Sequence, residues 1–575
     1  MLSLCHMHAR IMDAMARDGP PVMYATWSHP TGMSNDQNSL VSIFLNRVED
    51  SPDRAALLTK RNGEFVETTW RELHVLAFNA ARRLVALGVS PGDRVALICE
   101  NRLEWIVADL AIQLACAVNV PLNVALTLKQ VADLIEHSEA KLVFASPAVA
   151  TDSLRGLLPT ECQLIDIRLI SEDAYKLEAQ ASGFKRADDI RQSAVEYWQP
   201  DQLTTILYTS GTTGHPKGVM LSQQNLVSNT QSKIAAHQFD DADVRLGVLP
   251  LSHIFARTCD WYVTLLTGSR LALAESRLTF FEDCRAVRPT YLNAVPYFYD
   301  KCHRELVARG NADTTGALCE LLGGRMRCCL SGGAPLSRNL TDFFWRQNVP
   351  LVEGFGLTET SPVVCDCTLA AHRPGSVGRP IPGVEVRLTG DGELLTRGPH
   401  VMLGYFKDQQ ATDDVIRDDW LYTGDLAEID DDGFISIVGR KKELIITAGG
   451  QNVSPVYLES LLNSDPWVLQ SMVVGDRRNF LAALIAPDFG MLRQEIGNDA
   501  TADSDLVGRP CVHEEFEKRI ASALADVARY EQVRKFVLLT EPFSVQNDEI
   551  TTKGSLRRAV VAAHFADEIE GMYNV

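Results

Sequence analysis

The sequence predicts an α/β fold with more than one domain. Strand-like and helical stretches alternate from residue 94 onward, and several strand-like runs end in Gly-rich turns. Such alternation is typical of a parallel sheet covered by helices on both faces. The chain has 575 residues, which is too long for a single hydrophobic core.

The composition is that of a globular protein, with 46% hydrophobic and 22% charged residues. A formal net charge of −19 argues against a broad nucleic-acid surface, so no nucleic-acid partner is expected. The 13 cysteines lack C-x-x-C pairs and zinc-ligand spacing, which favours reduced thiols and a cytoplasmic location. The apolar stretch 105–120 contains Asp109 and Gln113, so no membrane span is predicted.

The first elements are predicted from local signals. Residues 1–37 mix Pro, Gly and polar residues without periodicity and are expected to form a loosely ordered extension. A helix is expected from Ser39 to Val48, followed by a hairpin turning at Asn62-Gly63. Thr69 and Glu72 form a capping box that opens a helix ending at Gly88.

The alternating region comes next. Strands are predicted at 94–99 and 141–146, and helices at 103–117 and 128–137, the second behind a Thr127 cap. The alternation of these strands and helices predicts a parallel sheet.

The stretch from Thr204 to Leu221 resembles a phosphate-binding loop. A strand-like run up to Thr209 is followed by Ser210, Gly211, Thr212, Thr213, Gly214 and Lys217. Glycines allow backbone N–H groups to approach an anion, hydroxyls add donors, and the lysine adds a positive charge. Pro216 stands where a Walker loop has glycine. The alternative is an ordinary Gly/Thr-rich hairpin turn, which would explain only a shorter run of Ser, Thr and Gly residues than the one present. Ser222 is placed to cap a helix through about His237.

Three further strand-like runs end in candidate ligand-binding turns. The run 245–251 leads to His253 and Arg257, the run 326–330 leads to Ser331-Gly-Gly-Ala334, and the run 351–353 leads to Gly354-Phe-Gly-Leu-Thr-Glu-Thr360. Ligands collect at the carboxyl ends of parallel strands, although a lone histidine there is more often structural.

The last part of the chain is predicted to be a β subdomain and a separate small α+β domain. Residues 375–430 contain short alternating runs and end near Thr423-Gly424-Asp425, and the final block follows Gly439-Arg-Lys-Lys-Glu443.

With these motifs in order, residues 39 to 560 resemble the adenylate-forming (AMP-binding) superfamily, and within it the long-chain fatty-acid–CoA ligases. The resemblance implies a large N-terminal domain, residues 38–438, of two packed α/β lobes plus a β subdomain. A hinge at 439–442 would join it to a mobile C-terminal domain at 443–575.

The chemistry implied by the resemblance has two steps. A fatty carboxylate attacks the α-phosphorus of ATP, giving acyl-AMP and pyrophosphate, and the thiolate of coenzyme A then displaces AMP. Mg²⁺ would offset the triphosphate charge.

The resemblance also implies roles for individual residues. The catalytic residues would be His253, Thr358, Glu359 and Lys553, with Glu359 as the metal ligand. The loop residues Thr209, Ser210, Gly211, Thr212, Thr213, Gly214 and Lys217 would bind the ATP phosphates. The adenine and ribose would contact Gly333, Ala334, Gly354, Phe355, Gly356, Asp425 and Arg440. The acyl group would contact His253, Gly332 and Gly333, and the hinge would contain Arg440, Lys441 and Lys442.

Plain structural interpretations stay open for some of these positions. Asp425 alone would be an ordinary turn residue, and Lys553 could be a solvated surface lysine. The family often has Pro where Thr551-Thr552 stands, and Tyr where Phe355 stands. The apolar stretches 262–266 and 292–298 are candidates for an acyl tunnel but are more often plain core. Arg257 has no predicted role.

Alternative functions also stay open. The acyl-AMP could pass to a separate acyl-carrier protein, the acid could be medium-chain or aryl, or the protein could be a nucleotide-binding regulatory relative without turnover. The sequence leaves open whether the protein contacts membranes peripherally and how many copies associate.

Overall fold

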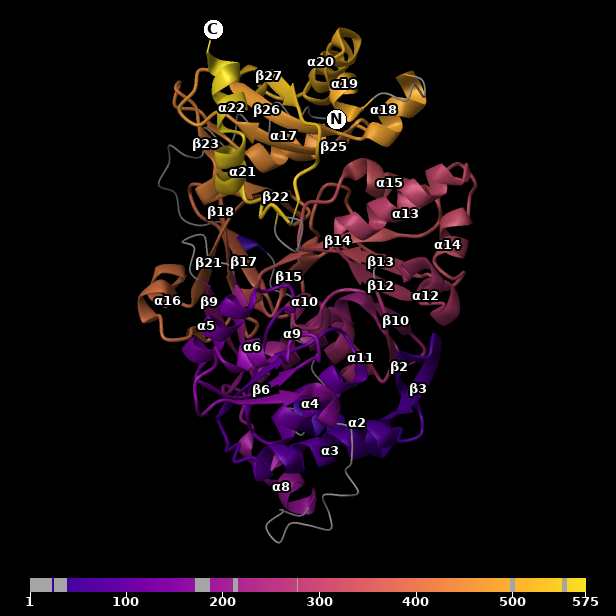
Figure 1. The fold of residues 1–575 in the computed structure, drawn as a ribbon, viewed down its shortest axis with the longest axis vertical. Helices are drawn as coiled ribbons and strands as arrows, with labels where there is room; N and C mark the ends of the chain where they lie inside the picture. The colour runs from indigo at the N-terminus through magenta and orange to yellow at the C-terminus, as the bar shows by residue number, and fades with distance from the viewer. Residues whose placement is uncertain are drawn as a thin grey trace.

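The computed structural model describes residues 23–24, 39–170, 187–209, 216–276, 278–496, 502–544, 546–550 and 556–574. The predicted α/β class is confirmed: a large N-terminal part containing three sheets is followed by a smaller C-terminal part, which lies at the top of Figure 1. None of the described helices is both long enough and apolar enough to cross a bilayer.

The first lobe is built on a seven-stranded sheet with the order β19-β9-β8-β5-β4-β6-β7. Its centre is parallel, and its β8–β9 and β9–β19 pairs are antiparallel. Strands β4 and β5 are buried along nearly their whole length, as expected for a sheet covered on both faces. The strands are β4 (Arg94–Ile98), β5 (Val118–Pro121), β6 (Ala140–Ala145), β7 (Gln163–Asp166), β8 (Leu203–Thr209), β9 (Lys217–Ser222) and β19 (Gly404–Tyr405).

The second lobe is built on a nine-stranded sheet with the order β16-β15-β14-β13-β12-β10-β11-β2-β3. It is parallel from β14 to β2 and antiparallel at both edges. The strands are β2 (Ala55–Arg61), β3 (Glu64–Thr69), β10 (Val244–Gly247), β11 (Arg270–Leu273), β12 (Tyr291–Ala294), β13 (Cys328–Ser331), β14 (Leu351–Gly356), β15 (Val363–Asp366) and β16 (Arg379–Pro380).

A third, six-stranded sheet forms the predicted β subdomain. It contains β17 (Glu385–Leu388), β18 (Glu393–Arg397), β20 (Ile416–Arg417), β21 (Trp420–Ile429), β22 (Ile435–Arg440) and the two-residue strand β1 (Met23–Tyr24). Strand β1 pairs antiparallel with β17, so part of the N-terminal extension adds an edge strand to a sheet formed by residues 385–440.

The predicted helix caps are confirmed. Thr69 caps α3 (Trp70–Ala86), Thr127 caps α5 (Leu128–Ser138) and Ser222 caps α9 (Gln223–His237), each in a capping box. The other helices before residue 440 are α2 (Leu40–Asp50), α4 (Leu103–Leu114), α6 (Asp152–Arg155), η1 (Ile167–Ile170), α8 (Ala187–Tyr197), α10 (Ile254–Ala256), η2 (Arg257–Tyr262), α11 (Val263–Thr267), α12 (Phe280–Val287), α13 (Pro296–Ala308), α14 (Ala317–Leu321), α15 (Arg338–Arg346), η3 (Thr358–Thr360) and α16 (Gln409–Val415).

Helix α4 ends three residues before the predicted boundary. Cys116 takes a left-handed conformation with φ of 58°. The N–H of Ala117 donates to the carbonyl of Ile112, and the N–H of Cys116 donates to that of Gln113. This Schellman arrangement closes the helix and lets β5 begin at Val118, although the sequence has no glycine at that point.

The C-terminal part has hydrophobic clusters of its own. One contains residues between Ile445 and Leu538, and the other contains residues between Met472 and Tyr573. They lie around a three-stranded sheet of β25 (Val468–Val474), β26 (Leu481–Pro487) and β27 (Val533–Leu538). The remaining elements are η4 (Lys441–Glu443), β23 (Ile445–Ile446), β24 (Asn452–Val453), α17 (Pro455–Leu462), α18 (Phe489–Ile496), α19 (Asp503–Val507), α20 (Pro510–Ala523), η5 (Arg529–Glu531), α21 (Arg558–His564) and α22 (Ala566–Tyr573).

Candidate active site

The predicted phosphate loop connects β8 to β9, and its two flanking residues are described. Thr209 ends β8 and lies directly opposite Lys217 at the start of β9. Ser210, Gly211, Thr212, Thr213 and Gly214 lie outside the described residues, as does Lys553. Their predicted roles therefore stay predictions.

Tyr405 connects the two charged groups expected at the triphosphate. Its hydroxyl donates to Oε1 of Glu359 at 2.8 Å. The Nζ of Lys217 lies 4.7 Å from the centre of its ring. The sequence analysis did not identify Tyr405, because a Gly-Tyr pair on a short edge strand carries no recognisable signal.

Glu359 lies on η3, a short 3₁₀ turn that follows β14. The backbone N–H of Met402 donates to the carbonyl of Glu359 at 2.9 Å. Thr360 closes the turn, since its hydroxyl accepts from the N–H of Leu357 at 2.8 Å. In the described part of the chain, no hydrogen bond or ion pair engages Oε2 of Glu359. The described residues also contain no group of three or more His, Cys, Asp or Glu side chains that could bind a metal ion without a substrate. A single carboxylate suits Mg²⁺, which is usually held by one or two carboxylates plus substrate phosphates.

A stripe of four polar side chains on α9 holds the segments around η3. Asn225, Asn229, Lys233 and His237 recur every fourth residue and therefore share one face of the helix. We call them the α9 stripe. Asn225 donates to the carbonyls of residues 399 and 401, Asn229 to those of residues 360 and 363, and Lys233 forms a buried ion pair with Asp366. Burial and the Lys233 charge lower the pKa of His237 to about 4, so its imidazole is neutral at pH 7.

The glycines beside Phe355 have a packing reason as well as the predicted nucleotide role. A Cβ on Gly354 would collide with Oδ1 of Asp366, and a Cβ on Gly356 would collide with the carbonyl of Pro362. The side chain of Asp366 on β15 therefore fills the space beside Gly354, and the backbone of Pro362, just before β15, fills the space beside Gly356.

Glu353 is a further carboxyl that the sequence analysis did not single out. It directly precedes Gly354, and its Oε1 accepts one hydrogen bond, from the N–H of Leu336 at 3.3 Å. Burial raises the pKa of Glu353 to about 8. A carboxyl that is largely neutral at pH 7 therefore lies beside the predicted adenine-binding segment.

The predicted acyl-binding residues come from two neighbouring segments. His253 caps the short helix α10, and its Nδ1 accepts from the N–H of Phe255 at 3.3 Å. The Phe255 ring lies 3.3 Å from the position that a Cβ on Gly332 would take. Gly333 follows with φ of 84°, a conformation that favours glycine, and Ala334 comes next in the same turn. The structure thus brings His253 and Gly332 to the same region.

Arg257 is completely buried and forms an ion pair that joins the two lobes. Its Nη2 lies 2.5 Å from Oδ1 of Asp109 on α4, and its Nη1 donates to Oγ1 of Thr205 on β8 at 2.8 Å. Asp109 also accepts from Asn119, Trp261 and Tyr262. Arg257, at the start of η2, therefore links this helix to β8, the strand that precedes the predicted phosphate loop.

Most side chains in the two apolar stretches considered for an acyl tunnel are buried, although Tyr297 is 59% exposed. Tyr262 and Leu265 in one stretch, and Leu292, Ala294 and Phe298 in the other, belong to the main hydrophobic cluster. Packing in the hydrophobic core, rather than an acyl tunnel, accounts for the burial of these five side chains.

The two residues expected at the ribose lie directly opposite each other on β21 and β22. Nε of Arg440 lies 2.9 Å from Oδ1 of Asp425. Burial raises the pKa of Asp425 to about 6, the Arg440 charge opposes this, and the charge of Glu359 contributes a further rise. Burial is the main cause of this shift, and the charge of Glu359 adds to it.

The predicted hinge begins at the same position. Arg440 ends β22, and Lys441 forms ion pairs with Asp391 at 2.6 Å and Glu393 at 3.0 Å. Lys442 follows on η4. The hinge segment is thus held to the β17–β18 hairpin in this structure.

Comparison with known proteins identifies the family of this chain. The AMP-binding enzyme family matches residues 44–406, and the AMP-binding enzyme C-terminal domain matches residues 442–575. The long-chain-fatty-acid–CoA ligase FadD15 of Mycobacterium bovis is 32% identical, with 94% of this chain and 98% of that protein covered. The long-chain-fatty-acid–CoA ligase ACSBG2 of Gallus gallus is 27% identical, with 94% and 82% covered.

A solved structure agrees. The crystal structure of ATP-bound MatB from Rhodopseudomonas palustris superposes with a TM-score of 0.72 at 26% identity, covering 92% of this chain and 99% of that one. Together with the family match over most of the sequence, these likenesses confirm the resemblance seen in the motifs. The chain belongs to the AMP-binding enzyme family.

Proposed function

We propose that this protein is an AMP-forming ligase that activates a long-chain fatty acid with ATP and transfers the acyl group to coenzyme A. The observation that carries the proposal is the contact of both Lys217 and Glu359 with Tyr405, together with the Asp425–Arg440 ion pair, in a chain that belongs to this family. The relatives named long-chain-fatty-acid–CoA ligases support the choice of acid and acceptor.

The described residues suit the first step. Lys217 supplies positive charge for the β- and γ-phosphates, and Asp425 accepts from the ribose hydroxyls. Thr358 would donate to the α-phosphate. A carboxylate that approaches ATP meets like charge, worth about 4 kcal/mol per pair at 4 Å and an effective dielectric of 20. Cationic groups around the triphosphate are therefore required.

The residues also suit a metal-dependent reaction. Glu359 would hold Mg²⁺ through a hard carboxylate oxygen. When bound, the ion would neutralise phosphate charge and favour attack at the α-phosphorus. Lys553 would stabilise the charge that develops in the transition state.

The second step would use the hinge. We infer that the C-terminal part rotates about residues 439–442 after acyl-AMP forms, which opens a path for the coenzyme A thiol. The glycine-containing turn at residues 448–452 would then face the site. In the present arrangement, the ion pairs of Lys441 hold the hinge segment to Asp391 and Glu393.

The test is a coupled assay with purified protein and acids of short, medium and long chain and an aryl acid. We expect acid-dependent pyrophosphate release and thioester formation with coenzyme A, fastest with long chains. Absence of acid-dependent pyrophosphate release would indicate a regulatory nucleotide-binding relative. Pyrophosphate release without coenzyme A thioester, but with loading of an acyl-carrier protein, would overturn the proposed acceptor.

A further inference from the structure

Lys217 and Glu359 carry opposite charges and both contact Tyr405, yet they form no ion pair within 4.0 Å in the described part of the chain. Tyr405 contacts both of them. The lysine lies over its ring face, 4.7 Å from the centroid, and the carboxylate accepts from its hydroxyl at 2.8 Å. The Tyr405 side chain therefore contacts the lysine through its ring and the carboxylate through its hydroxyl.

A direct Lys217–Glu359 ion pair would oppose the proposed reaction. It would neutralise the lysine expected at the triphosphate and the carboxylate expected at the cation before either ligand arrived. Breaking a close pair in a partly desolvated site costs affinity, because that pair must be exchanged for contacts with ligand. A contact between ammonium and ring is weaker than such a pair and leaves the three N–H donors of lysine available.

The hydroxyl of Tyr405 also orients the carboxylate. A carboxylate only accepts hydrogen bonds, so the phenol is the donor in this contact. Because Oε1 of Glu359 is held in this way, Oε2 is the oxygen left for a cation. The backbone of Glu359 is held by Met402, three residues before Tyr405 on the same segment.

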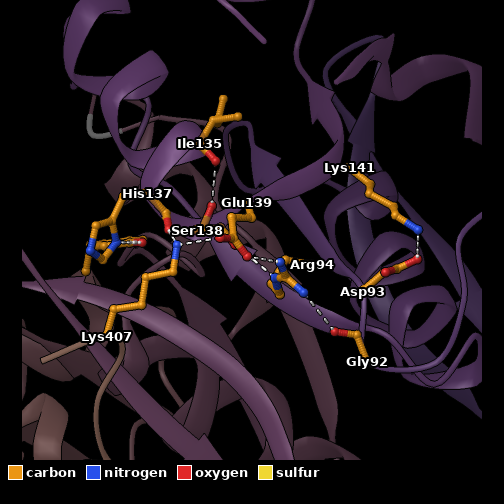
Figure 2. Close-up of polar contacts among 10 residues, drawn as sticks. Gly92, Asp93, Arg94, Ile135, His137, Ser138, Glu139, Lys141 and Lys407 are labelled. Atoms are coloured by element: carbon orange, nitrogen blue, oxygen red, sulfur yellow. Dashed lines mark hydrogen bonds and ion pairs between the residues drawn. The ribbon is translucent and has the colours of Figure 1, made fainter. Parts of the chain in front are cut away.

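The segment that carries Tyr405 is held firmly on both sides. Tyr405 itself is only 8% exposed, it pairs with Val219 on β9, and its N–H donates to Oγ1 of Thr412 at 2.8 Å. Figure 2 shows Lys407 reaching the C-terminus of α5, where Nζ donates to the carbonyl of His137 at 2.9 Å and to Oε1 of Glu139 at 2.8 Å.

The acceptor of Lys407 is itself held in place. Arg94 on β4 donates to Oε2 of Glu139 at 2.7 Å and to the carbonyl of Ser138 at 2.9 Å, as Figure 2 also shows. The segment around Tyr405 is therefore tied to the central strands of the first sheet. A ring anchored in this way can act as a fixed spacer.

We propose that Tyr405 is a positioning residue that keeps Lys217 and Glu359 apart, with its ring holding the lysine and its hydroxyl orienting the carboxylate, so that both are available to Mg²⁺–ATP. The inference rests on the proposed function and deepens it. It assigns no contact between Tyr405 and the reacting atoms.

The test compares two variants of the full-length protein by calorimetric binding of α,β-methylene-ATP, which cannot be cleaved at the reacting bond. Binding is measured with excess MgCl₂ and, separately, with EDTA. Tyr405→Phe keeps the ring and removes only the hydroxyl, so we expect about tenfold weaker binding with MgCl₂ and unchanged binding with EDTA. Tyr405→Leu also removes the spacer, so binding should weaken under both conditions.

A double-mutant cycle isolates the contact with the carboxylate. In a Glu359→Gln background, Tyr405→Phe should cause little further loss, because the charged acceptor is already absent. Tyr573→Phe is the matched control, since its hydroxyl bonds to the carbonyls of Val474 and Phe480 in the C-terminal part, away from this contact. Unchanged thermal unfolding of each variant shows that the fold is retained.

The outcomes separate this role from the proposed function. If wild-type protein binds the analogue equally with MgCl₂ and with EDTA, the metal-dependent site is wrong and the role of Tyr405 is overturned with it. If wild type shows a metal dependence that Tyr405→Phe leaves unchanged, or if the two losses in the cycle are additive, the role of Tyr405 alone is overturned.

Discussion

Arg257, which has no role predicted from the sequence, is explained by its partner in the structure. It lies four positions after His253, in a region expected to bind a fatty acid. The structure shows that its partner is Asp109, which is 148 positions away along the chain and equally buried. The charge of Arg257 is therefore compensated inside the protein.

Replacing Arg257 with Met should destabilise the protein by about 3–5 kcal/mol, because Asp109 would be left buried without its cationic partner. Urea unfolding of the variant and wild type measures the difference. The control is Arg71→Met, whose partner Asp53 is 80% exposed and whose own side chain is 60% exposed. That change should leave the free energy of unfolding nearly unchanged, because solvent screens an exposed ion pair. Equal effects would contradict a special role for the buried pair.

Asp425 leads to a pH-dependent prediction. A carboxylate accepts from both ribose hydroxyls, and its protonated form loses part of that capacity. Because burial raises the pKa of Asp425 to about 6, AMP affinity should fall about fourfold between about pH 7.5 and about pH 5.5. Fluorescence or calorimetric titrations measure the change.

The sign of the stability effect separates this loss from unfolding. The folded-state pKa is raised, so the folded protein takes up a proton before the unfolded chain does, and the contribution of Asp425 to stability increases as pH falls through 6. Asp425→Asn should remove its share of the pH dependence of AMP binding. An unchanged profile in that variant would show that another group titrates.

Among the elements, α9 has an unusual role. Most surface helices bury an apolar face, but the α9 stripe buries polar groups that hold three separate segments. Asn229 contributes both donors and acceptors: its Nδ2 donates to the carbonyls of residues 360 and 363, and its Oδ1 accepts from the N–H of Val363. The helix that follows the phosphate loop thus also positions the turn carrying Glu359.

Asn229→Ala should loosen the turn at residues 358–363. The change leaves buried backbone groups unpaired, at a cost of about 1–3 kcal/mol for each group that finds no water. Hydrogen exchange should become faster at these amides while β12 and β13 stay protected. Ser228→Ala, which removes only a bond to the carbonyl of Asn225, is the control and should leave exchange at 358–363 unchanged.

At the scale of the whole molecule, the proposed chemistry is divided between the two parts of the chain. The phosphate, metal and ribose residues lie before residue 441, whereas Lys553 belongs to the C-terminal part. Arg558 lies near that lysine in sequence and pairs with Glu459 on α17 and with Glu443 beside the hinge. Arg558, five positions after Lys553, is therefore tied to Glu443, the residue that follows the predicted hinge.

Lys553→Ala should reduce acyl-AMP formation by about 100-fold or more, because charge stabilisation in the transition state is lost. Thioester formation from supplied acyl-AMP should be largely retained, since the lysine is needed only in the first step. Lys518→Ala, an exposed lysine in the same part of the chain, is the control. Equal losses in both half-reactions would contradict the assignment.

Much of the fold and part of the site could be predicted from local patterns. Thr69, Thr127 and Ser222 cap their helices as expected, because a capping box involves residues only three positions apart. Asp425 and Arg440, grouped through the resemblance, do lie together. The role of Tyr405 could not be predicted, because its partners lie on other strands and turns and its own segment has no distinctive composition.

The sequence by itself determined the α/β class, the order of the motifs and, through that order, the enzyme family. These features depend on periodicity and on short-range spacing, which can be recognised in the sequence alone. Only the tertiary structure decided that Arg257 pairs with Asp109, that Asp366 and Pro362 crowd Gly354 and Gly356, and that Tyr405 contacts both Lys217 and Glu359. Each of these contacts depends on close packing between separate segments, most of which are far apart in the chain. Local sequence patterns do not indicate which distant segments pack together.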